Sequence, residues 1–202
     1  MTVLMRVAAL LAALVAGPAA ATQDAWPALH DVSGVAPDDV LNVRAAPSAT
    51  AEIVGALAPD AAGVEVVRPS EDERWGLVNV GERSGWVSLD FLDRHPGQFY
   101  GARPRIASCF GTEPFWTLDF DEPGRVLMTT PDRPATAGTE LGWSIGVNRY
   151  DRYAVLIAFG GLQVGAIRLE RCGDGMSDRE YGIGFDLMDG EHVLSGCCTL
   201  QR

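Results

Sequence analysis

The feature that most constrains the fold of this chain is a succession of short strand-like runs separated by turn residues. In residues 41–47, Leu41 and Val43 alternate with Asn42 and Arg44 before Pro47 breaks the run, which is the pattern of a half-buried strand feeding a turn. Similar runs occupy residues 53–57, 64–67, 75–80 and 85–88, and residues 81–84 predict a hairpin turn. Residues 31–92 show no sustained helical period, so this spacing predicts a small β-barrel.

The second half of the chain has the same character. Strand-like runs lie at residues 125–130, 141–147, 153–159, 164–170, 181–188 and 191–200, and Asp189-Gly190 is a strong hairpin signal between the last two. Residues 93–108 contain Pro and Gly with little periodicity, which predicts a linker. We therefore expect an all-β protein, with a small barrel at residues 31–92 and a disulfide-stapled antiparallel sheet or barrel at residues 109–202.

The N-terminus has the pattern of a secretory signal. Arg6 precedes an apolar run over residues 7–16, and the small residues Ala19 and Ala21 follow, which predicts a signal peptide at residues 1–21. The apolar run is shorter than the roughly 18–20 residues that cross a membrane. We expect an exported, periplasmic protein without a membrane span after cleavage, in which residues 22–30 form a short mobile leader.

The charge excludes several classes of partner. The formal charge is −11, and it becomes −12 without residues 1–21, which hold Arg6 and no acidic residue. This excess argues against non-specific binding to nucleic acid, anionic lipid or wall polyanions. A single basic pocket could still bind an anion, because salt screens exposed charges beyond roughly 8–10 Å. The sequence does not indicate an oligomeric state.

The chain has four cysteines, which in an exported protein predict two disulfides. They are Cys109, Cys172, Cys197 and Cys198. None has the spacing of a redox or zinc motif, so we expect no metal and no cofactor. Adjacent cysteines on a strand point to opposite faces and so take different partners. Three connectivities are open, and we favour one bridge from Cys172 into the vicinal pair and one from Cys109.

Residues 41–92 resemble the bacterial SH3-type (SH3b) domains. The resemblance is carried by Leu41-Asn42-Val43-Arg44 with Pro47, by residues 53–57, by Trp75 and Val78, by Gly85-Trp86-Val87 and by Phe91-Leu92, where Phe91 replaces the usual Tyr. It implies an SH3-like barrel that binds cell-wall material or peptides.

Residues 109–198 resemble an uncharacterised family of bacterial envelope domains. Its G-N-E-P-F-W and C-x-D-G-M-S-D-R-x-Y motifs correspond here to residues 111–116 and 172–181, with Thr112 in place of Asn and Gly182 in place of the usual Pro. The resemblance implies architecture and location rather than chemistry. The motif residues expected to have structural roles are Glu113, Trp116, Asp174, Asp178 and Arg179.

Within the second motif we expect Asp174 and Ser177 to accept hydrogen bonds from backbone N–H groups of the loop. We also hypothesise that Arg179 pairs with Glu113. A calcium loop at Asp174, Asp178 and Glu180 is poorly supported, because the run lacks alternating acids with a trailing Glu.

The candidate ligand site is a peptide groove on the first domain, made by Asn42, Arg44, Trp75, Trp86 and Asp90. Arg44 could form a fork with a carboxylate of a wall stem peptide, and an indole face could pack on the peptide or on a sugar ring. The competing interpretation is that both Trp side chains belong to the core and that Arg44 pairs with Asp90.

The sequence offers no catalytic set. There is no G-x-S-x-G motif, and the acids Asp119 and Asp121 beside a turn are expected to be solvated rather than a glycosidase pair. We therefore expect an envelope-binding protein, not an enzyme, whose SH3b module binds a peptidoglycan stem peptide or an envelope protein. The alternative is that the C-terminal domain inhibits a lysozyme-type hydrolase or carries a small ligand.

Overall fold

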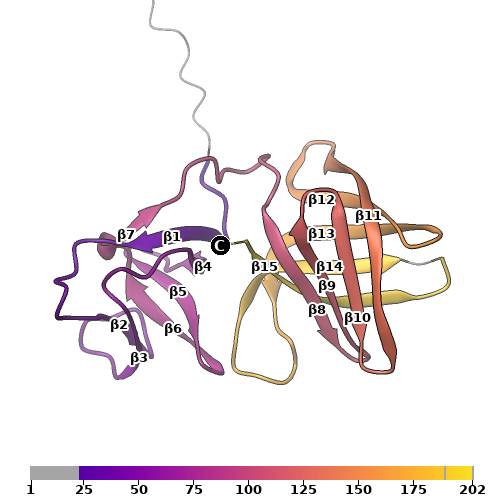
Figure 1. Ribbon diagram of the computed structural model, residues 1–202. Coiled ribbons are helices and arrows are strands. Elements are labelled where there is room, and N and C mark those ends of the chain that lie inside the picture. The colour runs from indigo at the N-terminus through magenta and orange to yellow at the C-terminus, as the bar shows by residue number, and fades with distance from the viewer. Residues whose placement is uncertain (1–22, 189, 202) are drawn as a thin grey trace, which may run out of the picture.

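A computed structural model describes residues 23–188 and 190–201, and the predicted signal peptide lies outside them (Figure 1). The N-terminal domain is one antiparallel sheet in the order β3-β2-β6-β5-β4-β1-β7, folded around a valine-rich core of its own. Its strands are β1 (Ala28–Val32), β2 (Leu41–Arg44), β3 (Ile53–Leu57), β4 (Val64–Pro69), β5 (Trp75–Val80), β6 (Arg83–Ser88) and β7 (Leu92–Arg94), with one 3-10 turn, η1 (Leu89–Phe91).

The C-terminal domain is a closed eight-stranded barrel, so the expected all-β fold is confirmed. Each strand pairs with the next in sequence, and β15 returns to pair with β8. The strands are β8 (Ile106–Thr112), β9 (Phe115–Glu122), β10 (Arg125–Thr130), β11 (Arg133–Gly146), β12 (Arg149–Ala158), β13 (Leu162–Cys172), β14 (Tyr181–Met188) and β15 (Val193–Leu200). In the described part of the chain, no helix is long and apolar enough to cross a membrane.

Two disulfides staple the barrel with the favoured connectivity. Cys109 on β8 is bonded to Cys198 on β15, and Cys172 at the end of β13 is bonded to Cys197. The neighbours Cys197 and Cys198 point to opposite faces of β15, and Cys198 belongs to the barrel core. Such bonds are typical of oxidising compartments outside the cytoplasm.

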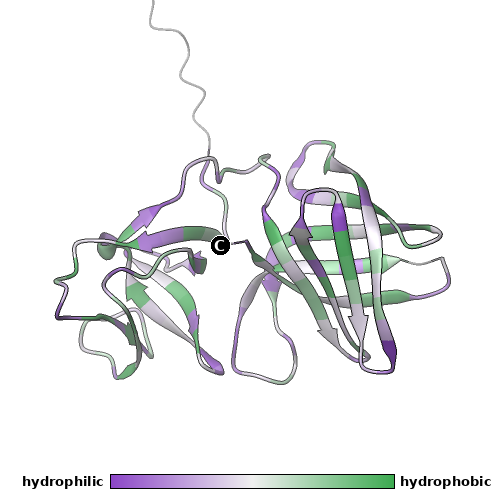
Figure 2. Cartoon of the chain, viewed as in Figure 1, coloured by the Kyte–Doolittle hydropathy of each residue, from purple (hydrophilic) through white to green (hydrophobic). Residues whose placement is uncertain are grey.

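Glycines that face the barrel interior make room for aromatic rings. Gly165 lies opposite Val155, and a Cβ at Gly165 would stand 2.6 Å from the Phe185 ring. A Cβ at Gly138 would stand 2.5 Å from the Phe159 ring. The rings therefore pack directly against the glycine backbone inside the barrel. Apolar and polar residues alternate along the strands (Figure 2).

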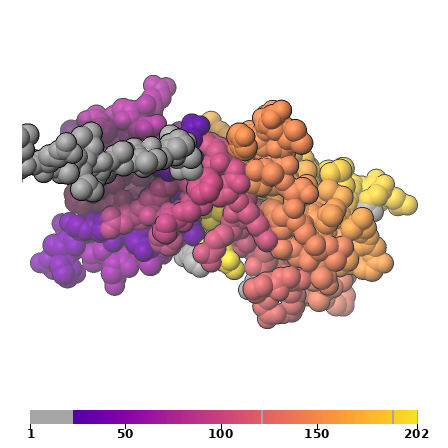
Figure 3. Space-filling view, turned by 90° about the horizontal axis from the view of Figure 1, so that it is seen from above, coloured from indigo at the N-terminus to yellow at the C-terminus, as the bar shows by residue number. Residues whose placement is uncertain are grey.

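One end of the barrel is closed by the segment that joins the two domains. The Arg103 guanidinium donates to both carboxylate oxygens of Glu140, at 2.9 and 2.8 Å, and lies 4.1 Å from the centre of the Trp143 ring. The Tyr153 hydroxyl donates to the Ala102 carbonyl at 2.8 Å. Seen from above, the segment around residue 100 lies across the junction of the two domains (Figure 3).

The prediction of a mobile leader is wrong for residues 23–30, which are fixed at the junction. The backbone of this segment pairs with the linker, since Ala25 N donates to the Gln98 carbonyl and Tyr100 N donates to the Gln23 carbonyl. Leu29 packs into the core of the barrel although it belongs to β1. The local pattern of residues 23–30 does not indicate this order, because the backbone partners lie about 75 residues away in the chain.

We predict that Gly165→Ala destabilises the barrel by about 1–3 kcal/mol, because the added methyl group overpacks against the Phe185 ring. Urea denaturation measures this change. Gly161→Ala is the matched control, since a Cβ there meets nothing within 4 Å. Equal stabilities of the two variants would contradict the glycine–aromatic packing.

Stability should also fall as the pH drops from about 6.5 to about 4. His30 on β1 is buried and stacks on Trp26, and its burial lowers its pKa to about 4, against about 6.5 in an unfolded chain. The unfolded state thus binds more protons than the folded state in this pH window. The free energy of unfolding therefore decreases by about 3 kcal/mol across it. Urea denaturation of His30→Gln between pH 7 and 4.5 should show a shallower dependence of the unfolding free energy on pH than the wild type shows, and an unchanged dependence would contradict the role of buried His30.

Candidate functional site

The barrel has a cavity of about 530 Å³ at the end away from the N-terminal domain. Its lining comes from residues in or next to four turns, namely those that join β8 to β9, β10 to β11, β12 to β13 and β14 to β15. Its lining includes Trp116, Met128, Phe159, Leu187 and Leu194 as apolar residues and Thr130, Thr136, Asp132, Arg133, Gln163 and His192 as polar residues. The volume lies in the range of small-molecule sites. We call this cavity the barrel mouth.

Strand register explains which side chains reach the barrel mouth. Leu187 lies opposite Leu194, and both face inward next to the glycine–aromatic pairs. Gln163 lies opposite the fully buried Ile157, and Thr136 lies opposite Met128, so these two polar side chains also face the interior. The mouth thus has an apolar floor with a few polar groups, the usual composition of a ligand pocket.

Trp116, predicted as a structural motif residue, forms part of this floor. It is only 3% exposed, and its ring lies 6.0 Å from that of Phe185. Within the described residues its indole N–H is buried without a hydrogen-bond acceptor. Glu113 precedes Pro114 in the turn before β9 and is exposed. The first motif therefore supplies one edge of the barrel mouth.

The predicted pairing of Arg179 with Glu113 is wrong. Arg179 Nε donates to the Gly81 carbonyl at 2.6 Å, and Nη2 contacts Glu82 Oε1 at 3.2 Å. Both partners belong to the turn between β5 and β6 of the other domain. The segments 111–116 and 172–181 lie at opposite ends of the barrel, because the turn after β8 and the loop after β13 leave from opposite ends of a meander.

The Asp174 loop is organised as predicted. Asp174 Oδ1 accepts hydrogen bonds from the N–H groups of Met176 and Ser177, each at 2.9 Å, and Ser177 Oγ accepts one from Arg179 N at 3.2 Å. Of the carboxylates considered for calcium, that of Asp174 organises this loop and that of Glu180 forms ion pairs with Arg68 and Arg171. No group of three or more His, Cys, Asp or Glu side chains suited to a metal occurs among residues 23–188 and 190–201.

Glu180 locks this loop to the N-terminal domain. It is 8% exposed and forms ion pairs with Arg68 of β4 and with Arg171 of β13, the latter at 2.6 Å. Its backbone N–H donates to Ser84 Oγ at 2.8 Å, and its carbonyl accepts from Asn79 Nδ2 at 2.9 Å. Asp178 adds backbone hydrogen bonds with Glu82 and Ser84. Sequence reasoning missed Glu180 as a junction residue.

The predicted peptide-groove residues lie on the outer side of the N-terminal sheet, with Asp90 at its end in η1. Arg44 is opposite Trp86 in the β2–β6 register, and its Nη1 donates to the Ala51 carbonyl at 2.8 Å. The Arg68 guanidinium lies 4.9 Å from the Trp86 ring centre. Asn42, Trp75 and Trp86 are half-buried rather than core residues, and Asp90 is exposed.

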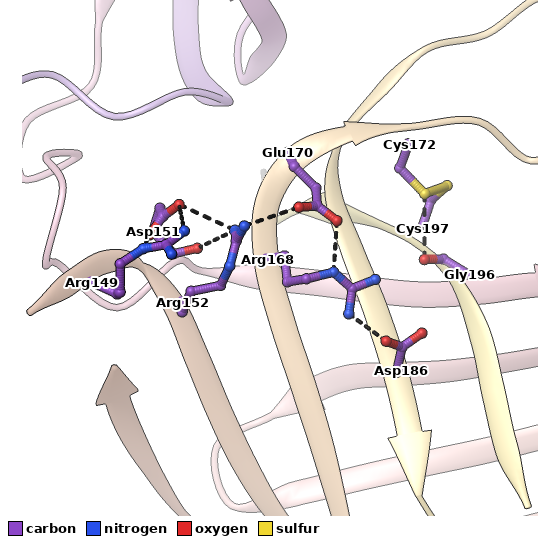
Figure 4. Close-up of polar contacts among 9 residues, drawn as sticks. All are labelled: Arg149, Asp151, Arg152, Arg168, Glu170, Cys172, Asp186, Gly196 and Cys197. Carbon is purple, nitrogen blue, oxygen red and sulfur yellow. Dashed lines mark hydrogen bonds and ion pairs between the residues drawn. A yellow bond between two sulfur atoms is a disulfide. The ribbon is translucent and has the colours of Figure 1, made fainter. Parts of the chain in front are cut away.

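Charges on the outer face of β12, β13 and β14 are paired with one another (Figure 4). Asp151 contacts Arg149 and Arg152, Arg152 contacts Glu170 at 3.1 Å, and Arg168 contacts both Glu170 and Asp186. Hydrogen bonding to Glu170 raises the pKa of Arg168, and hydrogen bonding from Arg149 lowers the pKa of Asp151. We call this set of ion pairs the ion-pair ladder. It links neighbouring strands, and each arginine in it has an acidic partner.

Comparison with known proteins found no matching family model, no matching curated protein and no matching solved structure.

Proposed function

We propose that this is an exported binding protein whose barrel mouth holds a small ligand with an apolar body. The observation that carries the proposal is the cavity of about 530 Å³, which is open at one end of the barrel while the linker closes the other end. Eight-stranded barrels of this size are just wide enough to hold one small ligand.

The chemistry of the barrel mouth favours retention of a ligand. Contact with its apolar floor contributes roughly 25 cal/mol of favourable binding free energy for each Å² of apolar ligand surface removed from water. Gln163 and Thr136 offer an amide and a hydroxyl that can orient a polar group. The glycine–aromatic pairs hold the floor in place before binding, which lowers the ordering cost.

We predict that the dye 1-anilinonaphthalene-8-sulfonate binds at the barrel mouth and that Gln163→Trp weakens binding at least tenfold, because the indole occupies the cavity. Fluorescence titration gives Kd, and circular dichroism verifies that the variant is folded. Trp75→Ala, on the other domain, should bind the dye as the wild type does. Unchanged binding by folded Gln163→Trp would count against the mouth as the site.

A second candidate function is binding of a wall stem peptide or an envelope protein by the SH3b-like domain. It is supported by the half-exposed position of Trp75 and Trp86 and by Arg44 beside them on one sheet face. Arg44 would then meet a peptide carboxylate, and an indole would cover the peptide chain.

Sedimentation with purified peptidoglycan tests this candidate. We expect Arg44→Ala and Trp75→Ala to reduce the bound fraction severalfold, because each removes a contact that the proposed groove requires. Arg133→Ala at the barrel mouth is the control for charge and should sediment like the wild type. Absence of sedimentation, combined with inhibition of lysozyme by the same protein, would instead favour the hydrolase inhibitor.

A further inference from the structure

The outer surface next to the barrel mouth is apolar. Leu156 is paired with Val164, Val164 with Met188, and Met188 with Val193, so these side chains form one row across β12 to β15. Leu156, Met188 and Val193 are 37%, 39% and 58% exposed, and Leu162 at the start of β13 is 62% exposed. We call Leu156, Leu162, Val164, Met188 and Val193 the apolar collar.

The collar differs from the rest of the same face. Farther from the mouth along β13 and β14, the outward side chains are Arg168, Glu170 and Asp186 of the ion-pair ladder (Figure 4). The surface thus changes from paired charges to exposed aliphatic groups within a few residues of each strand. Phe115, 52% exposed, adds an apolar group from the start of β9. Contiguous exposed apolar patches on a soluble surface mark contact sites.

Together, the collar and the cavity favour an elongated apolar ligand over a compact one. A small compact molecule would be covered by the cavity and would gain nothing from aliphatic groups outside it. A flexible chain passing over the rim contacts both surfaces in turn. Met128 in the floor and Met188 in the collar are unbranched and adaptable, which suits such a chain.

Resting on the proposed function, we propose that the ligand of the barrel mouth is an acyl chain. The chain lies on the floor made by Trp116, Met128 and Leu187, and its polar head stays at the rim near Arg133 and His192. The collar lies where the head or the remainder of a lipid would emerge. The source is either a free fatty acid or a lipid in a membrane, and the two share this chemistry.

A series of unbranched fatty acids from six to sixteen carbons tests the inference by displacement of the anilinonaphthalene dye. Affinity should rise about fourfold for each added CH₂ and then level off when the cavity is filled. Trp75→Ala on the other domain should retain the series, whereas Thr136→Trp should level off at a shorter chain because it narrows the mouth.

The two proposals fail differently. If the dye binds but affinity does not depend on chain length, the acyl ligand is overturned while the small-ligand site stands. If neither the dye nor any acid binds the folded protein, both proposals are overturned. A plateau that stays at the same length in folded Thr136→Trp also overturns the placement of the chain in the mouth.

Flotation with vesicles of zwitterionic phosphatidylcholine distinguishes the sources, since the acidic protein is repelled by anionic lipid. If the source is a membrane, Leu162→Asp should lose most of the floating fraction, because Leu162 is 62% exposed in the collar. Val147→Asp is the matched control, because Val147 is 89% exposed in the turn at the opposite end of the barrel. Equal losses in both variants would overturn the role of the collar. Acid binding without flotation supports the acyl chain and assigns its source to free acids.

Discussion

The packing of aromatic rings against inward-facing glycines is the constraint on which the functional part of this structure depends. An eight-stranded barrel has an interior that side chains can just fill. Here Phe185 lies against Gly165, and Phe159 lies against Gly138. The rings pack inside the barrel, and the cavity of about 530 Å³ lies toward the turns at one end.

The opposite end is shaped by a different kind of interaction. Arg103 combines an ion pair with Glu140 and stacking on Trp143, so the linker is held by charge and by the face of an aromatic ring together. The domain junction next to it depends on Glu180, whose buried carboxylate is neutralised from both domains. Removing one partner of such a buried group would leave an uncompensated charge, which explains why the loop after β13 follows the β5–β6 turn so closely.

Much of the fold could be predicted from local patterns, and the limits of the prediction follow from distance along the chain. Alternation and turn residues located β10 and β14 at their observed bounds, and the vicinal cysteines indicated the bridge pattern. The start of β11 at Arg133 was missed, because Pro134 and Gly138 resemble a loop although they lie in a strand. The barrel mouth could not be predicted, since Gln163 and Leu194 meet only after register and closure are known. For the same reason Arg179 was assigned the wrong partner.

Both ends of the described chain leave the molecule at the domain junction. Gln23 pairs with Tyr100, and Gln201 N donates to the Arg105 carbonyl. The residues that line the barrel mouth lie near the turns at the other end of the barrel, and the C-terminal end of the chain is marked between the two domains in Figure 1. If the protein is coupled to a surface or bead through either terminus, the attachment point therefore lies at the domain junction. Immobilised in this way, the protein would present its cavity to the passing solution, which makes it suited to biosensor measurements without redesign of the attachment point.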